Sequence, residues 1–455
     1  MSTDLRALIQ RYDKPGPRYT AYPMPPAWME HLPESDLMAA LKRANADPSP
    51  LSLYAHLPFC RRRCAYCGCN VVVSPHYDPV SAFLESLERE ADLWAKHLPD
   101  RRAVIQMHWG GGTPTYLTVP DLQKTFDLIT RRFELLPGAE VSLEADPTFL
   151  TDDQLPALRK MGFNRVSFGV QDLDEDVQAL ITRGQTWDQT LAAVKQARTE
   201  GFEGVNLDLV YGLPGQTLDT FRRTLEETLE LNPDRLAVYG FAYLPSMLPY
   251  QRSIPEETLP KPETRLDLLL LASELLEKAG YVAVGMDHFA HPDDPLAKAV
   301  HDGRLTRNFM GYAVKGGSDM VSLGPSAISD IGGVYHQNDK ILTRWEHAVD
   351  EGRFAMSKGL ACTEEDLLRR WIIHQLMGRF ELRWDEVQAR WGVGADHFAD
   401  ALKQLEAEVP NGVVTLKADG VFVTELGKRF VRNLVMPFDA YLPGFAGRTA
   451  FSRTV

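Results

Sequence analysis

Four of the five cysteines of the chain lie close together, at Cys60, Cys64, Cys67 and Cys69, and Cys362 stands alone far downstream. Thiolates are soft ligands that bind zinc ions and iron–sulfur clusters in proteins. The spacing of the first three gives a 4Fe–4S cluster three protein ligands and leaves one iron open to bind another molecule. The alternative is a structural zinc site with Cys69 as its fourth ligand. Zinc sites usually combine two Cys/His pairs from separate segments, and the sequence has no second pair, so a cluster is favoured.

A glycine run forms the second candidate motif, Gly110-Gly111-Gly112-Thr113. Glycine carries no side chain, so backbone groups in such a run can approach a ligand closely. A tight turn would explain three glycines equally well. Both this run and the cysteines follow a predicted strand, and this shared position favours a binding role for the two motifs together.

From about residue 50, runs of β-branched or aromatic residues alternate with stretches of helical period. The pattern predicts strands at 51–57, 104–110, 140–146, 165–171, 205–212 and 235–244. It predicts helices between them at 80–98, 119–133, 151–162 and 218–231. Because strands that alternate with helices form a parallel sheet with right-handed crossovers, the expected fold class is α/β.

The placement of polar and glycine residues distinguishes two forms of this sheet. Residues 110–113, Glu144, Gln171, Asp208 and Ala242 each lie at or just beyond the end of a different predicted strand. A barrel gathers such positions at its mouth. A doubly wound sheet, the alternative, would concentrate them at one switch point. We therefore expect a partial barrel.

Three domains are expected from the change of pattern along the chain. Residues 1–49 begin with a stretch rich in Pro and Tyr that has no periodic element in its first 35 residues, which predicts an extended arm before a lead-in helix. Residues 50–345 contain the barrel and an extension with a helix at 264–279 and strands at 281–289 and 319–327. Residues 346–455 form a mainly helical C-terminal domain.

The C-terminal domain has a recognisable order of elements. Helical patterns at 364–377, 384–391 and 396–408 precede a hairpin at 412–424 whose turn is predicted at Asp419-Gly420. Helices followed by a hairpin and a further helix resemble a winged helix. A winged helix would suggest a second class of function, that of a cluster-bearing transcription regulator.

Composition excludes several classes of protein. The 455 residues carry a net charge of −13 with 44% hydrophobic and 24% charged residues, which is typical of a globular chain rather than a disordered, fibrous or disulfide-rich one. No apolar stretch reaches the roughly 18 to 20 residues that span a bilayer, and the start of the chain lacks the apolar region of a secretory signal. We expect a cytoplasmic protein. The acidic charge disfavours nucleic acid as a partner.

The spacing of Cys60, Cys64 and Cys67, with Tyr66 before the last cysteine, resembles the signature of the radical S-adenosylmethionine superfamily. The resemblance fits the partial barrel, as a three-quarter (β/α)6 barrel, to which the sequence pattern adds the N-terminal arm and the winged-helix-like C-terminal domain. It also implies that S-adenosylmethionine binds the open iron, where an electron from the cluster splits it into methionine and a 5′-deoxyadenosyl radical. The glycine run is similar to the motif that contacts the methionine amino group in this superfamily.

Further segments narrow the resemblance to one family over nearly the full length. The segments YAHLPFCRRRCAYCGCN, HWGGGTPTYL, LEADP, RVSFGVQ, DLVYGLPGQT, GMDHFA, PRYTAYP and RNFMGY are similar to those of the oxygen-independent coproporphyrinogen III oxidases. This family decarboxylates two propionates of coproporphyrinogen III to vinyl groups, which gives protoporphyrinogen IX in haem biosynthesis. Its members hold two S-adenosylmethionine molecules, so the same substrate, reaction and cofactors are expected here.

The resemblance assigns roles to individual residues. Cys60, Cys64 and Cys67 would hold the cluster. The cluster-bound S-adenosylmethionine would contact Tyr54, Gly111, Glu144 and Ile328. The second molecule would contact Tyr66, Gly112, Thr113, Gln171, Arg183, Asp208 and Ala242. The residues expected to take part in catalysis are Tyr54, Glu144, Phe309 and Cys69.

The sequence also suggests how the chain contacts its substrate and its electron donor. The basic run Arg61-Arg62-Arg63, together with Arg18, Arg304 and Arg307, offers cations for the substrate carboxylates, with a solvated charged loop as the alternative for the run. A flavodoxin or ferredoxin is expected as the electron donor, and the chain is expected to be a monomer.

The chain departs from the family at Tyr66 and Met310, where the family has Phe and Gln. The alternative function is that of a related haem-degrading or haem-trafficking protein. The segment Gly68-Cys69-Asn70 argues against the haem-carrying relatives, which have Phe two residues past the last cluster cysteine.

Overall fold

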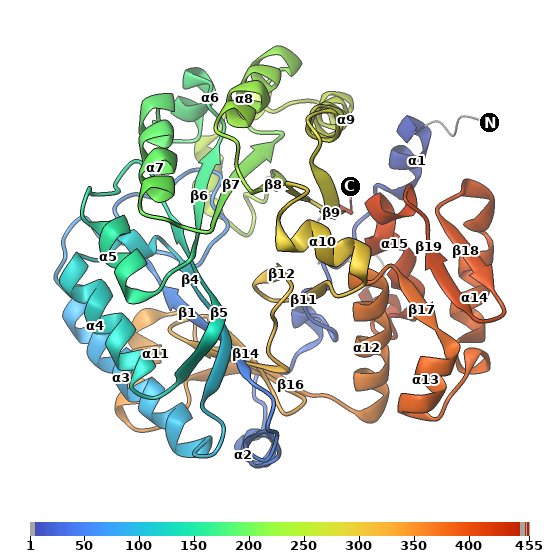
Figure 1. Ribbon diagram of the computed structural model, residues 1–455, viewed down its shortest axis with the longest axis horizontal. Coiled ribbons are helices and arrows are strands. Elements are labelled where there is room, and N and C mark those ends of the chain that lie inside the picture. The colour runs from blue at the N-terminus through green and yellow to red at the C-terminus, as the bar shows by residue number, and fades with distance from the viewer. Residues whose placement is uncertain (1–4, 446–450, 452, 455) are drawn as a thin grey trace. The chain divides into compact units, whose positions relative to one another are not determined.

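The computed structural model describes residues 5–445, 451 and 453–454 (Figure 1). Contacts divide the chain into two compact units, each assembled from separate segments. We call residues 29–280 and 315–361 the barrel unit, and the described residues of 1–28, 281–314 and 362–455 the helical unit. The three domains expected from the sequence, with boundaries near residues 49 and 345, stay a prediction. Among the described residues, no helix has the length and apolar character needed to span a membrane.

Six parallel strands form the centre of the barrel unit. They are β1 (Leu51–Leu57), β4 (Ala103–Gly111), β5 (Glu134–Ala145), β6 (Arg165–Gln171), β7 (Gly204–Tyr211) and β8 (Arg235–Gly240). Each lies beside its predecessor in this series, so the order of these six strands does not reverse. The other edge of β1 pairs with β13 (Asp319–Leu323), and the barrel is therefore partial. The expected partial (β/α)6 barrel is confirmed.

Helices cover the outside of this curved sheet (Figure 1). They are α3 (Pro79–His97), α4 (Val119–Thr130), α5 (Gln154–Met161), α6 (Glu175–Leu180), α7 (Trp187–Thr199), α8 (Leu218–Glu230) and α9 (Pro262–Lys278). In α3 the buried residues Val80, Phe83, Leu87 and Trp94 recur at helical spacing, which gives the helix one apolar face. The sequence did not predict α6 and α7, although Thr186 and Gln189 form a capping box at the start of α7.

The extension of the sheet consists of β13, β14 (Ile328–Ile331), β15 (Val334–Asn338) and β16 (Met356–Ala361), and α2 (Glu34–Asn45) and α11 (Leu342–Asp350) belong to the same unit. The strand expected at 319–327 ends at Leu323, because Gly324 has a φ of +96° and turns the chain. A Cβ on Gly324 would lie 2.4 Å from the carbonyl oxygen of His56. The buried Glu90 of α3 secures this turn by accepting hydrogen bonds from Gly324 N (2.7 Å) and Asn338 Nδ2 (2.6 Å).

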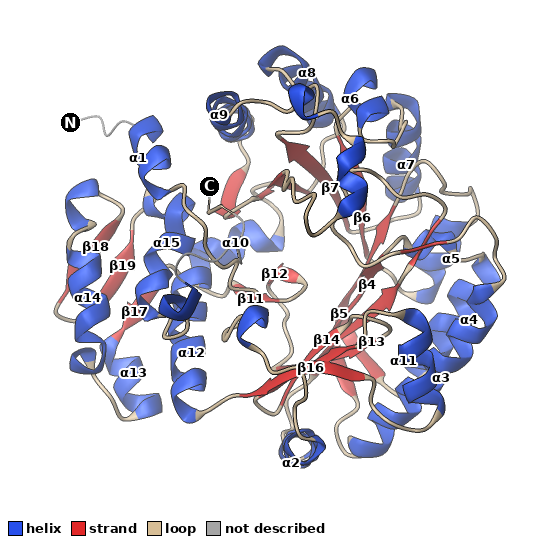
Figure 2. Cartoon of the chain, turned by 180° about the vertical axis from the view of Figure 1, so that it is seen from behind, coloured by secondary structure: helices blue, strands red, loops and turns tan. Residues whose placement is uncertain are grey.

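The C-terminal part of the helical unit has the winged-helix order that the sequence predicts (Figure 2). It runs through α12 (Glu364–Gly378), β17 (Glu381–Arg383), α13 (Trp384–Trp391), α14 (Ala399–Glu406), β18 (Val414–Lys417), β19 (Gly420–Val423) and α15 (Val431–Val435). The unit also contains α1 (Leu5–Tyr12), β9 (Val282–Gly285), β10 (His288–Ala290), α10 (Pro295–Asp302), β11 (Thr306–Asn308) and β12 (Gly311–Ala313).

Two expectations for this unit are wrong. The first 35 residues contain α1, because Leu8, Ile9 and Tyr12 bury one side of it and the Tyr12 ring packs 4.6 Å from that of Phe430. Segment 281–289 is a hairpin of β9 and β10 rather than one strand, with Met286 in the left-handed region at φ +50°.

The hairpin of β18 and β19 forms as predicted, but its turn lies one residue earlier than expected. Lys417 pairs with Gly420, which leaves Ala418 and Asp419 as the turn. Gly420 is the first residue of β19, and a Cβ there would lie 2.2 Å from the carbonyl oxygen of Leu382 in β17. This glycine is therefore required by the close approach of two strands and not by a positive φ.

Gly420→Ala is expected to destabilise the helical unit by about 1–3 kcal/mol, because the new methyl group overlaps the Leu382 carbonyl. Gly394→Ala is the matched control, since a Cβ at Gly394 meets its nearest neighbouring atom at 3.8 Å. Thermal unfolding followed by circular dichroism should show a lower midpoint for Gly420→Ala alone. Equal midpoints for the two variants would contradict this account.

Candidate active site at the ends of the barrel strands

A cavity of about 730 Å³ lies at the C-terminal ends of the barrel strands. Its lining includes the four clustered cysteines and most residues predicted from the sequence. These predicted lining residues are Tyr66, Gly111, Gly112, Thr113, Glu144, Gln171, Arg183, Asp208 and Ala242. These residues are spread over more than 180 positions of the sequence. They meet in one cavity because the parallel strands all end at the same side of the barrel.

The cysteine loop is fixed at both ends by a short two-stranded sheet. Cys60 ends β2 (Phe59–Cys60), which pairs with β3 (Val72–Val73). The Cys60 thiol lies 3.6 Å from Thr113 Oγ1, and the Tyr250 hydroxyl donates to the Cys67 carbonyl oxygen. The loop thus returns to its starting point and presents its thiols to the cavity.

The thiols suit a cluster better than a single metal ion. Among the described residues, no three or more His, Cys, Asp or Glu side chains form a group that could hold a single metal ion. A cluster binds each thiolate through a different iron, so its ligands need not converge on one point. Burial raises the pKa of the Cys60 thiol to about 12, and a hydrogen bond from Cys69 lowers that of Cys67 to about 7. Cys69 thus contacts a predicted ligand and lines the cavity.

The glycine run is required by the packing of the protein itself. Gly111 has a φ of +117°, and a Cβ on Gly112 would lie 2.5 Å from the carbonyl oxygen of Pro58. Gly112 N donates to the Leu57 carbonyl oxygen at 2.9 Å, and Thr113 N donates to that of Phe59 at 2.9 Å. These contacts place the end of β4 directly against the segment that leads into the cysteine loop.

Glu144 faces the cavity beside the glycine run. Its Oε2 accepts from Gly111 N at 3.3 Å, and its Oε1 lies 3.5 Å from His108 Nε2. Burial acts to raise the pKa of Glu144, but the His108 hydrogen bond, the Gly111 N–H and the nearby His56 outweigh it and lower this pKa. Glu144 is therefore a carboxylate ready to accept further hydrogen bonds in the cavity.

Tyr54 lies behind this carboxylate and is not part of the cavity lining that the structure describes. Its ring stacks on that of His108 at 6.0 Å, and its hydroxyl lies 3.1 Å from His56 Nδ1. His56 Nε2 lies 2.9 Å from the Asn70 carbonyl oxygen. Tyr54 thus links the position of His108, and through it Glu144, to the end of the cysteine loop.

Asp208 is a second carboxylate of the cavity, from β7. It accepts from Ser167 Oγ at 3.0 Å and from Asn206 Nδ2 at 2.8 Å. Burial, with the negative charge of Glu144, raises the pKa of Asp208 to about 6. It lies within the strand, three residues before its end, and reaches the cavity because its side chain points to the barrel interior.

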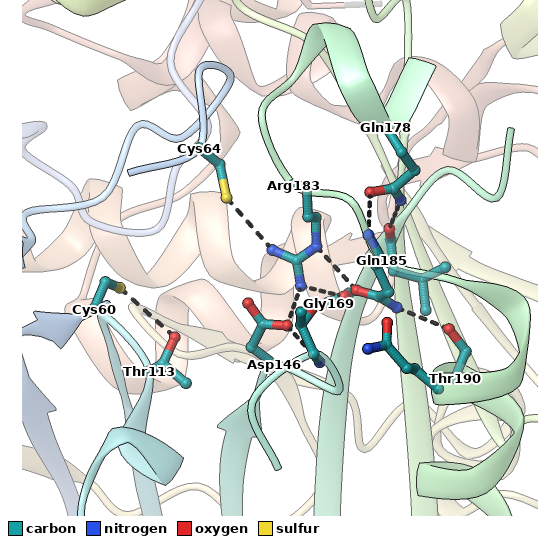
Figure 3. Close-up of polar contacts among 12 residues, drawn as sticks. Cys60, Cys64, Thr113, Asp146, Gly169, Gln178, Arg183, Gln185 and Thr190 are labelled. Atoms are coloured by element: carbon teal, nitrogen blue, oxygen red, sulfur yellow. Dashed lines mark hydrogen bonds and ion pairs between the residues drawn. The ribbon is translucent and has the colours of Figure 1, made fainter. Parts of the chain in front are cut away.

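Arg183 provides the buried cation of the site (Figure 3). Its guanidinium donates to Gln185 Oε1 at 2.9 Å and to the Gly169 carbonyl oxygen at 2.5 Å, and it pairs with Asp146 at 3.2 Å. It also reaches Tyr66 OH at 3.3 Å and Cys64 Sγ at 3.8 Å. These contacts fix the orientation of the planar Arg183 guanidinium beside Cys64, a predicted cluster ligand.

Besides Tyr54, two predicted residues lie outside this lining. Ile328 begins β14 in the barrel unit, where its carbonyl oxygen accepts from Ser322 Oγ. Phe309 lies in the helical unit, where its ring meets that of Trp28 edge-on at 6.0 Å. The roles expected for these two residues stay predictions.

Three residues that hold the site were not among the predicted site residues: His56, His108 and Asp146. His56 and Asp146 each follow a predicted residue by two positions, at Tyr54 and Glu144, and His108 precedes the glycine run by two. Alternate residues of a strand share a face, so this period of two was the signal that could have identified them.

The Arg183–Asp146 pair yields a stability prediction. Arg183→Met leaves the Asp146 carboxylate without its cation and should lower the free energy of unfolding by about 3–5 kcal/mol. Arg183→Met combined with Asp146→Leu should cost less than the sum of the single changes. Urea unfolding of the cluster-free protein measures both.

The control is Arg223→Met, which breaks the exposed Arg223–Asp174 pair at the same 3.2 Å and should cost about 0–1 kcal/mol. If both variants lost the same free energy of unfolding, burial of the Arg183–Asp146 pair would not add to the cost of breaking it.

Comparisons with known proteins agree with this geometry. The radical SAM superfamily model matches residues 54–228. The oxygen-independent coproporphyrinogen III oxidase of Escherichia coli K12 is 42% identical, with 99% of this chain and 98% of that protein covered. The protein of the same name from Pseudomonas aeruginosa is 41% identical, with 98% of both covered. The structure of coproporphyrinogen III oxidase from Escherichia coli, described as a radical SAM enzyme, matches 96% of this chain and 98% of its own, at a TM-score of 0.91 and 40% identity.

The match extends over both units and over every segment that contributes to the cavity. A 4Fe–4S cluster and S-adenosylmethionine are the cofactors that this superfamily uses, and the cysteines and polar groups of the cavity suit both. The chain belongs to the oxygen-independent coproporphyrinogen III oxidases, a family of the radical SAM superfamily.

Proposed function

We propose that this chain converts coproporphyrinogen III to protoporphyrinogen IX by oxidative decarboxylation of two propionates, with its chemistry in the cavity of the barrel unit. The observation that carries the proposal is the convergence of three cysteines, a glycine run, two carboxylates and a buried guanidinium on one cavity. Its volume of about 730 Å³ lies within the usual range of cofactor sites.

We propose that Cys60, Cys64 and Cys67 hold the cluster, whose cofactor chemistry removes a hydrogen atom from the substrate side chain. The sequence spacing and the soft thiol donors support this set, and Cys69 is left as their neighbour. The Arg183 guanidinium beside Cys64 and the Thr113 hydroxyl beside Cys60 would stabilise the sulfur atoms electrostatically.

The remaining groups fit two molecules of S-adenosylmethionine. For the first, we propose Gly111, Glu144, Ile328 and Tyr54. Glu144 supports this choice as a carboxylate that can accept from an ammonium or a hydroxyl group. Tyr54 would act by fixing His108 and so the orientation of the Glu144 carboxylate.

For the second molecule, we propose Tyr66, Gly112, Thr113, Gln171, Arg183, Asp208 and Ala242. Arg183 can bind a carboxylate group, and Asp208 can accept from ribose hydroxyls. The Tyr66 hydroxyl, which the family's Phe lacks, makes its contact with Arg183. This tyrosine would therefore hold the guanidinium in place.

Basic residues at the cavity are suited to a tetracarboxylate substrate. Arg61 and Arg62 lie over the Phe149 ring at 5.3 and 5.1 Å, and Arg63 lies over that of Tyr250 at 4.7 Å. All three line the cavity. We propose that they attract the propionates that are not removed. Stacking on aromatic rings leaves guanidinium edges able to donate. Arg63 uses one of its donors for the Val71 carbonyl oxygen at 3.0 Å, so its other N–H groups would be the ones to bind a carboxylate.

The remaining partners are also proposals. A flavodoxin or ferredoxin would supply the electrons, because no second cysteine group in the sequence could hold another cluster. We propose that the chain acts as a monomer in the cytoplasm and binds no nucleic acid. The C-terminal winged-helix order implies no DNA binding by itself, since fold does not fix function.

The first test concerns cluster ligation. Anaerobically reconstituted Cys64→Ala should lose iron, sulfide and the visible absorbance of the cluster, because a protein ligand is removed. Cys362→Ala is the matched control and should keep all three, since this cysteine lies in the helical unit. An intact cluster in Cys64→Ala, or stoichiometric zinc in the unaltered protein, would exclude this ligand set.

The second test concerns the reaction. Reduced, cluster-loaded protein supplied with S-adenosylmethionine and an electron acceptor should release CO2 and form protoporphyrinogen IX from coproporphyrinogen III without oxygen, with one S-adenosylmethionine consumed per propionate. Glu144→Gln should reduce turnover on the order of 100-fold with the cluster retained, because the cofactor is misplaced. Glu134→Gln, at the exposed start of the same strand, should leave turnover unchanged.

Product analysis and cluster absorbance distinguish the outcomes. If the protein released 5′-deoxyadenosine but neither CO2 nor a vinyl product, the decarboxylase function would be excluded and a haem-related radical enzyme favoured.

A further inference from the structure

A separate cavity of about 350 Å³ lies in the helical unit. It is built by the segment 303–307 between α10 and β11, by one face of α12, and by the end of α13. None of its lining residues belongs to the cavity of the barrel unit. Arg304 and Arg307, which the sequence offers as cations for the substrate carboxylates, lie in this lining and not in that of the barrel cavity.

The lining of this cavity is strongly cationic. It includes Arg304, Arg307, Arg370, Arg379 and Arg390, and no Asp or Glu belongs to the described lining. This concentration of positive charge contrasts with the net charge of −13 of the whole chain. The guanidinium groups around the cavity repel each other. An anion in the cavity would reduce this repulsion and would itself be attracted by the positive charge.

Carboxylates outside the lining balance only part of this charge. Arg379 pairs with Glu386 at 2.8 Å and with Glu381 at 3.1 Å, and Arg304 pairs with Asp302 at 2.7 Å. Arg390 has no carboxylate partner among the described residues. Its guanidinium instead lies 6.0 Å from the Trp371 ring and 5.6 Å from the Trp391 ring. These rings hold the cation in place without neutralising it.

Two further polar atoms in the lining lack partners. The Nε1 of Trp391 and the Nε2 of His374 are buried and have no hydrogen-bond partner among the described residues. An indole N–H can only donate, so its complement is an acceptor. Burial, with the charges of Arg370 and Arg307, lowers the pKa of His374 to about 3, and a neutral imidazole can also donate through Nε2. Both nitrogen atoms are enclosed by protein, and each can donate to an anion in the cavity once its side chain turns toward it.

We propose that this cavity binds a small organic anion through its carboxylate or phosphate groups. Arg390, Trp391 Nε1 and His374 Nε2 would donate to the anion, and the indole ring of Trp371 would contact its apolar part. The volume lies near the lower end of the range for small-molecule sites, so the ligand is smaller than a tetrapyrrole.

Anaerobic titration of the cluster-loaded full chain tests the proposal, with citrate and pyrophosphate as the two probes. Isothermal calorimetry should show saturable binding of at least one probe, with a dissociation constant below about 1 mM. Binding of citrate alone would identify a carboxylate ligand, and binding of pyrophosphate alone a phosphate ligand. Added KCl should weaken the binding, because the attraction is electrostatic.

Variants locate the binding. Arg390→Gln should weaken it by about tenfold, since a charge-assisted hydrogen bond is lost. Trp391→Phe keeps the ring, removes the donor and should weaken binding by about threefold, which provides a second test if Arg390→Gln does not fold. Arg11→Gln, at an exposed arginine outside the cavity, is the matched control and should bind like the unaltered chain.

Two results would overturn the proposal. One is no saturable binding of either probe up to about 10 mM. The other is binding that neither Arg390→Gln nor Trp391→Phe changes relative to Arg11→Gln. Circular dichroism and cluster absorbance establish that each variant is folded before it is titrated.

Discussion

The close contact between the glycine run and the start of the cysteine loop is the constraint on which the site depends. The pairing of β1 and β4 runs to Leu57 and Gly111 and continues past both strands, through hydrogen bonds from Gly112 and Thr113. A side chain at Gly112 would displace the Pro58 carbonyl, and with it the first cysteine. Two motifs that are about 50 positions apart in the sequence are therefore one structural unit. The barrel supplies the frame for this unit, since neighbouring parallel strands deliver both motifs to the same end.

Neighbouring groups determine the pKa of the two cavity carboxylates and the position of the buried Arg183 guanidinium. Glu144 is kept ionised by His108 and an amide, whereas Asp208, farther into β7, holds a proton more readily. Arg183 shares a buried position with Asp146 and extends to the Cys64 sulfur. Two carboxylates of similar chemistry thus differ in pKa through their surroundings alone. This separation allows one to act as a fixed acceptor and the other to exchange a proton near neutral pH.

The sequence predicted the parts of this structure that follow from local pattern. Strands β1 and β6 have the predicted ends, because alternating apolar residues define them without tertiary contacts. α1 was missed because its helical form depends on packing by Leu8, Ile9 and Tyr12 against distant segments. Gly420 was predicted in the turn, but it lies in β19. A glycine is needed there because the carbonyl oxygen of Leu382, in another strand, leaves no room for a side chain. In the site, cysteine spacing and the family resemblance identified most of the lining, while His56, His108 and Asp146 carried only the weak signal of a period of two and are identified by the contacts they make.

The helical unit has a consequence for how the chain is synthesised. Thr454 donates to the carbonyl oxygen of Tyr12, 442 positions earlier, and Pro15 forms a bridge with Arg453. Residues 12–15 are synthesised long before residues 453–454, and they wait for them before these contacts of the helical unit can form. During that time Leu8, Ile9 and Tyr12 have no permanent cover, although each is buried in the finished protein. A chain whose synthesis stopped before residue 453 would lack these contacts, so the segment of α1, made hundreds of residues earlier, would be the part left exposed to chaperones and proteases.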